Sequence, residues 1–336
     1  MQTTRIFLLL FVAISYSLPG LSQTQLSSST TGLSGSNPLF TGLQSFEKHN
    51  DSSIKIKKRV WTVAAGHSAL YAGSLLVLNE AWYKGYPKQN LASFDDRKEW
   101  LQVDKFGHAW SAYSLSRVSA RTWGWTGMNR KKADILGASS GFGFLTVIEI
   151  LDARSAKWGF SWTDIAANTF GTGLYLSQQL AWEEQRISLK YSFHRKSHAD
   201  TVLKARADDL FGSTWYEGML KDYNSQTYWL SANLKSFFKE SGLPPWLNIS
   251  IGYGADGLYG GFENLARDNS GNIIFDRRDI QRVRQFYLAP DIDFTRIKTN
   301  KKWLKRLFFV LKGFKFPAPT LMVNSKGKWK GYWGYF

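Results

Sequence analysis

The spacing of hydrophobic residues changes once along this chain, close to Arg186. Before that point apolar residues recur every three to four positions, and after it they alternate with polar residues. The pattern therefore predicts an α+β fold, in which a polar-cored four-helix bundle at residues 59–185 precedes an antiparallel β region at residues 186–336. We expect the four helices at residues 60–82, 104–122, 131–153 and 161–184.

Short alternating runs predict the strands of the second half. They lie at residues 187–193, 230–234, 247–253, 286–294, 321–323 and 329–336. Ser325 to Lys328 has the composition of a hairpin turn. The stretch from Trp303 to Leu311 is basic and amphipathic, which favours a short interfacial helix. The chain ends in an aromatic run closing with Phe336, a feature of bacterial outer-membrane barrels, so a partial or small barrel is an alternative to an open sheet.

The N-terminus has the pattern of a secretory signal. Arg5 is followed by an apolar core, and Gly20 and Ser22 place small residues where a signal peptidase acts. We expect residues 1–23 to be a signal peptide and residues 24–58, rich in Ser and Thr, to be a disordered linker. The protein is therefore expected to be exported, to the periplasm or outer membrane of a Gram-negative bacterium.

The composition limits which cross-links and which binding partners this protein can have. The sequence contains no cysteine, which excludes disulfides, thiolate metal ligands and an acylated cysteine in this chain. Its net charge is +17, and for an exported protein the matching partner is a membrane or another anionic envelope surface rather than nucleic acid. A protein partner is also open, and the sequence leaves the oligomeric state undetermined.

Polar and charged residues interrupt the apolar helical segments at matching spacings. Helical periodicity places Asp104 over His108, Glu149 over Asp152, and Asp164 over Asn168. Because isolated charges on apolar faces are costly, we expect these side chains to meet between the helices. The predicted polar core network comprises Asp104, Lys105, His108, Glu149, Asp152, Asp164 and Asn168. Small residues such as Gly137, Gly171 and Gly173 are expected to let the helix backbones approach closely.

Three chemical roles are open to this network. The favoured one is structural, with buried ion pairs that set the helix register. A second is a divalent-metal site in which His108, Glu149 and Asp152 are the candidate ligands. The third is hydrolysis, with His108 as general base and candidate partners among Asp104, Glu149, Asp152 and Asp164. No serine elbow or phosphate loop accompanies these residues, so we assign no catalytic residue and no cofactor.

The same motifs carry a family resemblance. In order, they are Asp104-Lys105-x-x-His108, Gly137 with Gly141, Glu149-x-x-Asp152, Ser161-Trp162-x-Asp164, and Asn168 with Gly171. Residues 60–184 thereby resemble the YfiM-like family of predicted periplasmic lipoproteins, domain of unknown function 2279, and the stretch from Lys221 to Ser231 resembles its extended Bacteroidetes type. A weaker similarity links the helices to VanZ-like membrane proteins. The resemblance implies an envelope location and brings no known activity.

These observations favour a non-enzymatic cell-envelope protein with an outer-membrane-associated structural or interaction role. The alternative is a membrane-apposed enzyme that acts on lipid or cell-wall precursors through His108 and the nearby carboxylates.

Overall fold

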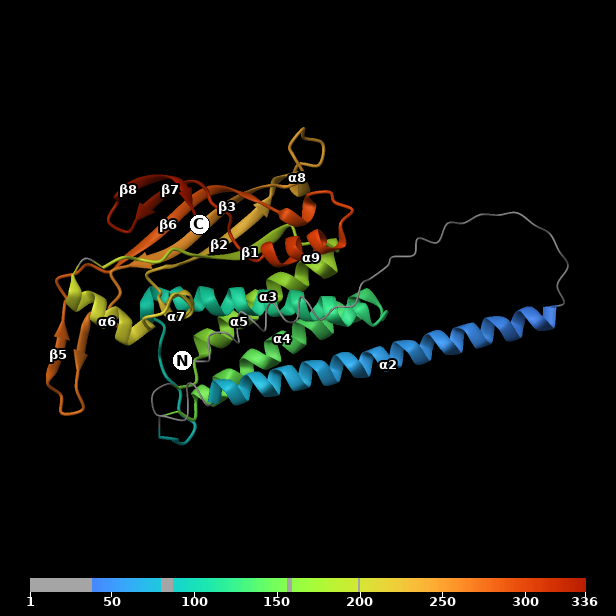
Figure 1. Ribbon diagram of the computed structural model, residues 1–336, viewed down its shortest axis with the longest axis horizontal. Helices are drawn as coiled ribbons and strands as arrows, with labels where there is room; N and C mark the ends of the chain where they lie inside the picture. The colour runs from blue at the N-terminus through green and yellow to red at the C-terminus, as the bar shows by residue number, and fades with distance from the viewer. Residues whose placement is uncertain (1–37, 80–86, 156–158, 199) are drawn as a thin grey trace.

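The computed structural model describes residues 38–79, 87–155, 159–198 and 200–336, with side chains from Ser53 onward. A bundle of long helices lies against one side of an antiparallel sheet (Figure 1). The predicted α+β class, with helices first and strands second, is confirmed. The bundle contains α2 (Pro38–Leu78), α3 (Val103–Trp125), α4 (Arg130–Asp152) and α5 (Trp162–Trp182).

Side-chain caps determine where two of these helices begin. The side chain of Asn129 accepts a hydrogen bond from the backbone N–H of Lys132 at the start of α4. Ser161 caps α5 in the same way by accepting from the N–H of Asp164, at 3.0 Å. Such caps satisfy backbone donors that have no partner inside the helix. This local chemistry explains why the start of α5 lies within one residue of the expected position.

Helix α2 begins well before the expected helix at residue 60. It starts at Pro38, so residues 38–58, which the sequence assigns to the linker, are helical. Proline is favoured in the first helical turn, and Leu39, Leu43 and Phe46 recur behind it at helical spacing. The average composition of the Ser- and Thr-rich stretch obscures this pattern. The expected signal peptide and residues 24–37 lie outside the described residues.

Helix α3 is the centre of the molecule. It packs against α4 and α5 on one side and contacts β1, β2 and β3 on the other. Two glycines let the backbones touch, as the sequence predicts: a methyl group on Gly171 would lie 2.0 Å from the carbonyl oxygen of Ala109, and one on Gly137 would lie 2.3 Å from Cα of Ala120. Gly173 differs from these two, because a methyl group there would meet nothing within 4 Å.

The main sheet has six antiparallel strands in the order β1-β2-β3-β6-β7-β8. They are β1 (Ile187–Phe193), β2 (Gln226–Asn233), β3 (Leu247–Asp256), β6 (Val283–Ile292), β7 (Ala318–Asn324) and β8 (Trp329–Tyr335). The predicted hairpin joins β7 to β8, with Gly327 at a φ of +73° in its turn. The sheet is open, which excludes the closed small barrel. The sheet is nevertheless curled, as shown by the Tyr335 hydroxyl on β8, which lies 3.1 Å from the Thr227 hydroxyl on β2.

Several short elements surround this frame. The amphipathic helix expected near Trp303 is present as α9. The pattern did not predict the other short helices or the second, two-stranded sheet, and all of these elements except the 11-residue helix at Thr201–Phe211 are too short to show a period. These elements are α6 (Thr201–Phe211), α7 (Trp215–Lys221), α8 (Leu234–Phe237), α9 (Lys302–Leu311), β4 (Leu265–Arg267), β5 (Ile273–Asp276), and the 3-10 turns η2 (Glu99–Gln102) and η3 (Phe294–Arg296).

On β3, β6 and β7 the main sheet buries its polar face and exposes its apolar one, whereas on β1 the apolar side chain of Leu189, on the same face, is buried against α3. On β3 and β6, Ile251 and Leu288 are cross-strand partners and are 58% and 47% exposed. Their neighbours in sequence, Ser250 and Ala289, point the other way and are buried. A sheet in water usually has the opposite arrangement, with polar side chains outside. We call the exposed residues Ile249, Ile251, Phe286, Leu288 and Leu321 the sheet apolar surface.

Candidate functional site

A buried ion cluster joins the starts of α3 and α5. The Lys105 ammonium lies 2.7 Å from Oδ1 of Asp164 and 2.9 Å from Oδ2 of Asp104. It also contacts Oδ2 of Asp96, in the loop that precedes α3. The four side chains are about nine-tenths buried. The structure thus brings the expected residues Asp104, Lys105 and Asp164 together and adds one that the sequence did not indicate.

Asp96 is that addition, and it links the loop to α5. Its Oδ1 accepts hydrogen bonds from the hydroxyls of Ser161, at 2.8 Å, and Thr163, at 2.6 Å. Burial alone would raise the pKa of Asp96, but the hydrogen bonds from Lys105, Thr163 and Ser161 hold it below its ordinary value. Asp96 was missed because it belongs to an irregular loop, where no periodicity relates a residue to the helices.

A strained turn connects Asp96 to Asp104. Trp100, Leu101 and Gln102 have φ angles of 48°, 49° and 66°, in the left-handed region that costs about 1–2 kcal/mol per residue. Packing offsets this cost: the Trp100 ring lies 5.1 Å from the ring of Tyr223, and the Gln102 amide donates to the carbonyl of Arg97 at 2.7 Å. The turn thereby holds two carboxylates of the cluster beside one ammonium.

His108 lies one helical turn beyond Asp104, between Asp164 and one further carboxyl group, that of Glu149. Its Nδ1 is 3.5 Å from Oε1 of Glu149, and its Nε2 is 3.6 Å from Oδ1 of Asp164. Glu149, on α4, is 1% exposed. Burial, followed by the charges of Asp164 and Asp152, raises the pKa of Glu149 to about 9, so its carboxyl is protonated at neutral pH. Burial likewise raises the pKa of Asp104 to about 6.

The two remaining expected members are placed differently. Asp152 acts on the cluster through its charge, which helps to raise the pKa of Glu149. Asn168 is 0% exposed on α5, one turn beyond Asp164, and neither atom of its amide has a hydrogen-bond partner among the described residues. Close ion contacts thus join Asp104, Lys105, His108, Glu149 and Asp164 with their loop partner Asp96.

The protonated Glu149 makes stability depend on pH. The carboxyl titrates near 4.5 when unfolded and near 9 when folded, so the folded state binds this proton more tightly. Its contribution is complete below pH 4.5 and is lost as the pH rises towards 9, by at most about 1.4 kcal/mol per pH unit. Glu149→Gln, which keeps the shape and cannot ionise, should lose less stability than the wild type between pH 5 and pH 8.5 in urea titrations. Parallel losses in the two proteins would contradict a protonated Glu149.

Two groups of ligand atoms are close enough for a metal ion. In each of the groups His108/Glu149/Asp164 and Asp96/Asp104/Asp164, the ligand atoms lie within 4.8 Å of one another. The second group already surrounds the Lys105 ammonium, which takes the place of a cation. The first would require Glu149 to lose its proton. The geometry thus groups His108 and Glu149 with Asp164, whereas spacing grouped them with Asp152.

A second buried network lies inside the curled sheet and was not predicted. Lys190 on β1 and Asp291 on β6 are both 0% exposed, with Nζ 2.6 Å from Oδ2. The Ser231 hydroxyl donates to the same oxygen at 2.6 Å, and the Asn248 amide donates to Ser231 at 2.8 Å. The signal was the alternation itself, because it places Ser188, Lys190 and Ser192 on one face of β1.

The comparisons with known proteins bear on the helical part. Residues 92–178 match the model of a family described as predicted periplasmic lipoprotein, DUF2279. This segment contains every residue of the ion cluster, from Asp96 to Asn168, and the resemblance stated from the sequence motifs is confirmed for it. The family description supports export to the periplasm. No curated protein and no solved structure matches the chain.

The DUF2279 segment covers the loop before α3 and all of α3 and α4, and extends into α5. It therefore coincides with the part of the bundle that the ion cluster joins, and it leaves out the whole β region. The similarity to VanZ-like proteins and the Bacteroidetes type stay predictions.

Proposed function

We propose that this protein is a non-enzymatic component of the cell envelope that lies against the outer membrane through the sheet apolar surface. The observation that carries this proposal is that the sheet exposes apolar side chains on β3, β6 and β7 and buries polar ones on the opposite face. In a protein surrounded only by water, a continuous exposed apolar patch is unfavourable, and such patches mark contact with a membrane or a partner. Outward apolar and inward polar residues are the arrangement of sheets that face lipid.

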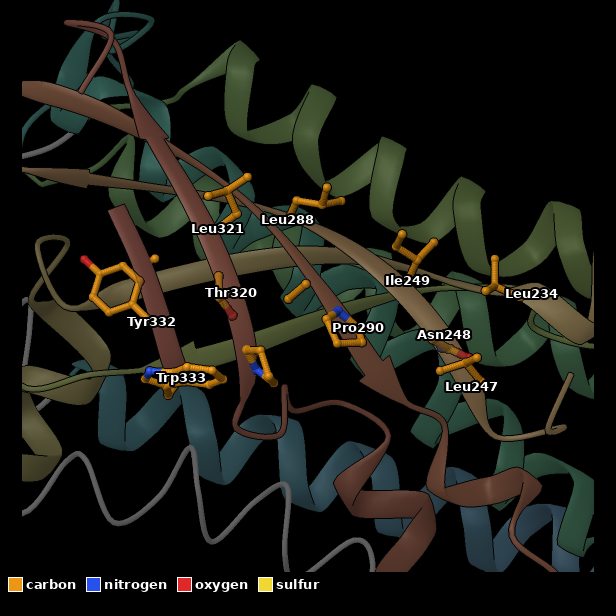
Figure 2. A pocket seen from close by; sticks show the side chains of 13 residues that line it. Leu234, Leu247, Asn248, Ile249, Leu288, Pro290, Thr320, Leu321, Tyr332 and Trp333 are labelled. Atoms are coloured by element: carbon orange, nitrogen blue, oxygen red, sulfur yellow. The ribbon is translucent and has the colours of Figure 1, made fainter. Parts of the chain in front are cut away.

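The patch is continuous because its residues are strand neighbours. Leu288 on β6 pairs with Ile251 on β3 and with Leu321 on β7. An open hollow of about 730 Å³ lies along these strands, bounded by Ile249, Leu288 and Leu321 and by Trp333 at the β8 side (Figure 2). Trp333 is almost fully exposed. Tryptophan is favoured at membrane interfaces because its ring is apolar and its N–H is polar.

The bundle adds a second apolar stripe. Leu136, Val147 and Ile150 recur at helical spacing on α4, and all three are exposed. The helical stretches Ser53–Leu78 and Arg130–Asp152 are long and apolar enough to cross a membrane. Core helices of water-soluble proteins meet the same criterion of length and composition. The proposal attributes attachment to these two protein surfaces.

The geometry of the cluster supports a structural role. The Lys105 ammonium has three hydrogens and three carboxylate neighbours, so it is fully used within the protein. Both ring nitrogens of His108 face carboxyl groups of the protein, and a general base needs one nitrogen directed at a substrate. The alternative, a hydrolytic enzyme acting on lipid or cell-wall precursors, is favoured by one observation: the His108 side chain is still 28% exposed.

Membrane fractionation tests the proposal. Ile251→Gln with Leu288→Gln should reduce the membrane-bound fraction of the exported protein about tenfold or more, because each exposed apolar side chain contributes about 1 kcal/mol or more when buried in lipid. The folded state should keep its melting temperature, since both side chains are already exposed. The matched control is Val202→Gln with Ile274→Gln, an exposed pair on α6 and β5 outside the surface.

The result is read from immunoblots of membrane and soluble periplasmic fractions. If the wild type is released entirely with the soluble periplasmic proteins, or if the control pair causes the same loss as the test pair, the sheet apolar surface does not hold the protein at a membrane.

A further inference from the structure

A second hollow, of about 560 Å³, lies between α3, the segment after β6, and α9. Four cationic side chains line it, and no acidic side chain does: these are Arg121, Arg296, Lys298 and Lys305. Thr299 and Asn300 supply polar groups at its wall, and the ring of Phe309 supplies an apolar one. Four cations around one hollow make it a region of positive potential.

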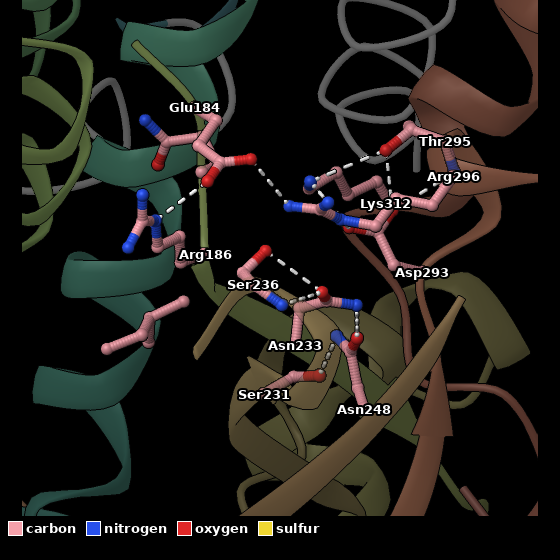
Figure 3. Close-up of polar contacts among 12 residues, drawn as sticks. Glu184, Arg186, Ser231, Asn233, Ser236, Asn248, Asp293, Thr295, Arg296 and Lys312 are labelled. Carbon is pink, nitrogen blue, oxygen red and sulfur yellow. Dashed lines mark hydrogen bonds and ion pairs between the residues drawn. The ribbon is translucent and has the colours of Figure 1, made fainter. Parts of the chain in front are cut away.

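Among the residues that the structure describes, only one of these cations is neutralised by an ion pair. Arg296 lies 3.1 Å from Glu184 and 3.5 Å from Asp293, and the Lys312 ammonium donates to the same Asp293 at 2.8 Å (Figure 3). Among the described residues, Arg121, Lys298 and Lys305 make no ion pair. The two nearby carboxylates are therefore already in use, and the charge at the hollow stays uncompensated.

The wall beside α3 concentrates charge further. The guanidinium groups of Arg117 and Arg121 lie 4.5 Å and 4.1 Å from the centre of the same Phe309 ring. Arg117 is buried and donates to the carbonyl of Phe309 at 2.9 Å, while its Nε and Nη2 have no hydrogen-bond partner among the described residues. Burial, followed by the charges of Arg117 and Arg306, lowers the pKa of Arg121. An anion in the hollow would relieve this repulsion.

We propose that the hollow binds the phosphate group of an anionic lipid. Guanidinium and ammonium groups are the usual donors to phosphate, and three of those at the hollow make no ion pair with a described residue. Helix α9 gives the reason for a lipid: Trp303 and Leu307 are 60% and 41% exposed on a helix that also supplies Lys305 to the hollow. An amphipathic basic helix with an exposed tryptophan fits the boundary between headgroups and acyl chains. This inference rests on the proposed membrane association and names the headgroup that is recognised.

Vesicle flotation with the full-length protein tests the site. Neutral phosphatidylcholine vesicles are compared with vesicles containing one-third phosphatidic acid. Lys298→Gln with Lys305→Gln should weaken binding to the anionic vesicles about 25-fold, since each cation near an anionic surface contributes about 1 kcal/mol, or roughly fivefold. Both lysines are exposed, so the fold should be unchanged. Binding to neutral vesicles should stay the same.

The control removes equal charge from another place. Lys326→Gln with Lys328→Gln changes two exposed lysines in the turn between β7 and β8, and binding to anionic vesicles should stay within about threefold of the wild type. Equal losses in the two double variants would overturn the site, because they would show attraction by net charge alone. A wild type that binds neither kind of vesicle would overturn the proposed function itself.

Inorganic phosphate separates the two sources of the ligand. Titration calorimetry of the full-length protein with phosphate should give no saturable heat below about 1 mM, since a lone phosphate lacks the contact between acyl chains and α9. Saturable binding at micromolar phosphate that is lost in Lys298→Gln with Lys305→Gln, without any change in vesicle binding, would assign the hollow to a free anion and overturn the lipid proposal.

Discussion

Replacing Lys105 by methionine is expected to lower the free energy of unfolding by about 3–5 kcal/mol. The substitution keeps the length of the side chain and removes the ammonium that lies among Asp96, Asp104 and Asp164. Three carboxylates would then be buried together without a counter-charge. Urea titrations followed by circular dichroism measure the loss, and Lys98→Met, an exposed lysine in the same loop region, should change stability by less than about 0.5 kcal/mol.

A second substitution distinguishes an ion cluster from general damage to packing. If Lys105→Met acts by leaving charge unpaired, adding Asp164→Asn should recover part of the lost stability, because it removes one of the uncompensated carboxylates. A double variant that is less stable than Lys105→Met alone, or a Lys105→Met variant as stable as the wild type, would contradict the structural role of the cluster.

Gly171→Ala and Gly173→Ala are expected to change stability in opposite directions. The new methyl group at Gly171 would lie 2.0 Å from the Ala109 carbonyl oxygen, so α5 would have to move away from α3, at a cost of about 2–3 kcal/mol. At Gly173 nothing lies within 4 Å, and alanine should stabilise the helix by about 0.5–1 kcal/mol. Thermal unfolding of the two variants measures both effects.

The two glycines are two positions apart in one helix and undergo the same chemical change. A similar effect of both substitutions, in either direction, would mean that α3 and α5 are not in direct backbone contact. The same result would also contradict our explanation for the position of Asp164 beside Lys105, because the contact between Gly171 and Ala109 sets the distance between the two helices.

Local patterns determined much of the bundle before any tertiary information. Apolar spacing placed the starts of α4 and α5 to within one residue, because this signal depends on residues within one or two helical turns. Helical spacing likewise placed Asp104 with His108 on one side of α3. The position of the loop residue Asp96 could not be predicted, since it depends on the left-handed turn from Trp100 to Gln102. That turn is held by the packing of Trp100 against Tyr223, a contact between segments that are distant in sequence.

In the β region the sequence pattern determines which residues share a face, and the tertiary structure determines which face is buried. Alternation determined that Lys190 and Tyr191, or Ser250 and Ile251, point to opposite faces of their strands. It could not say which face would be inside, because the pattern is the same for both choices. The curl of the sheet decided this by enclosing Lys190 with Asp291 and leaving Ile251 exposed. The charge pair is stable there because the Lys190 ammonium and the Ser231 hydroxyl both lie against Oδ2 of Asp291. Only the assembled strands bring these three groups together.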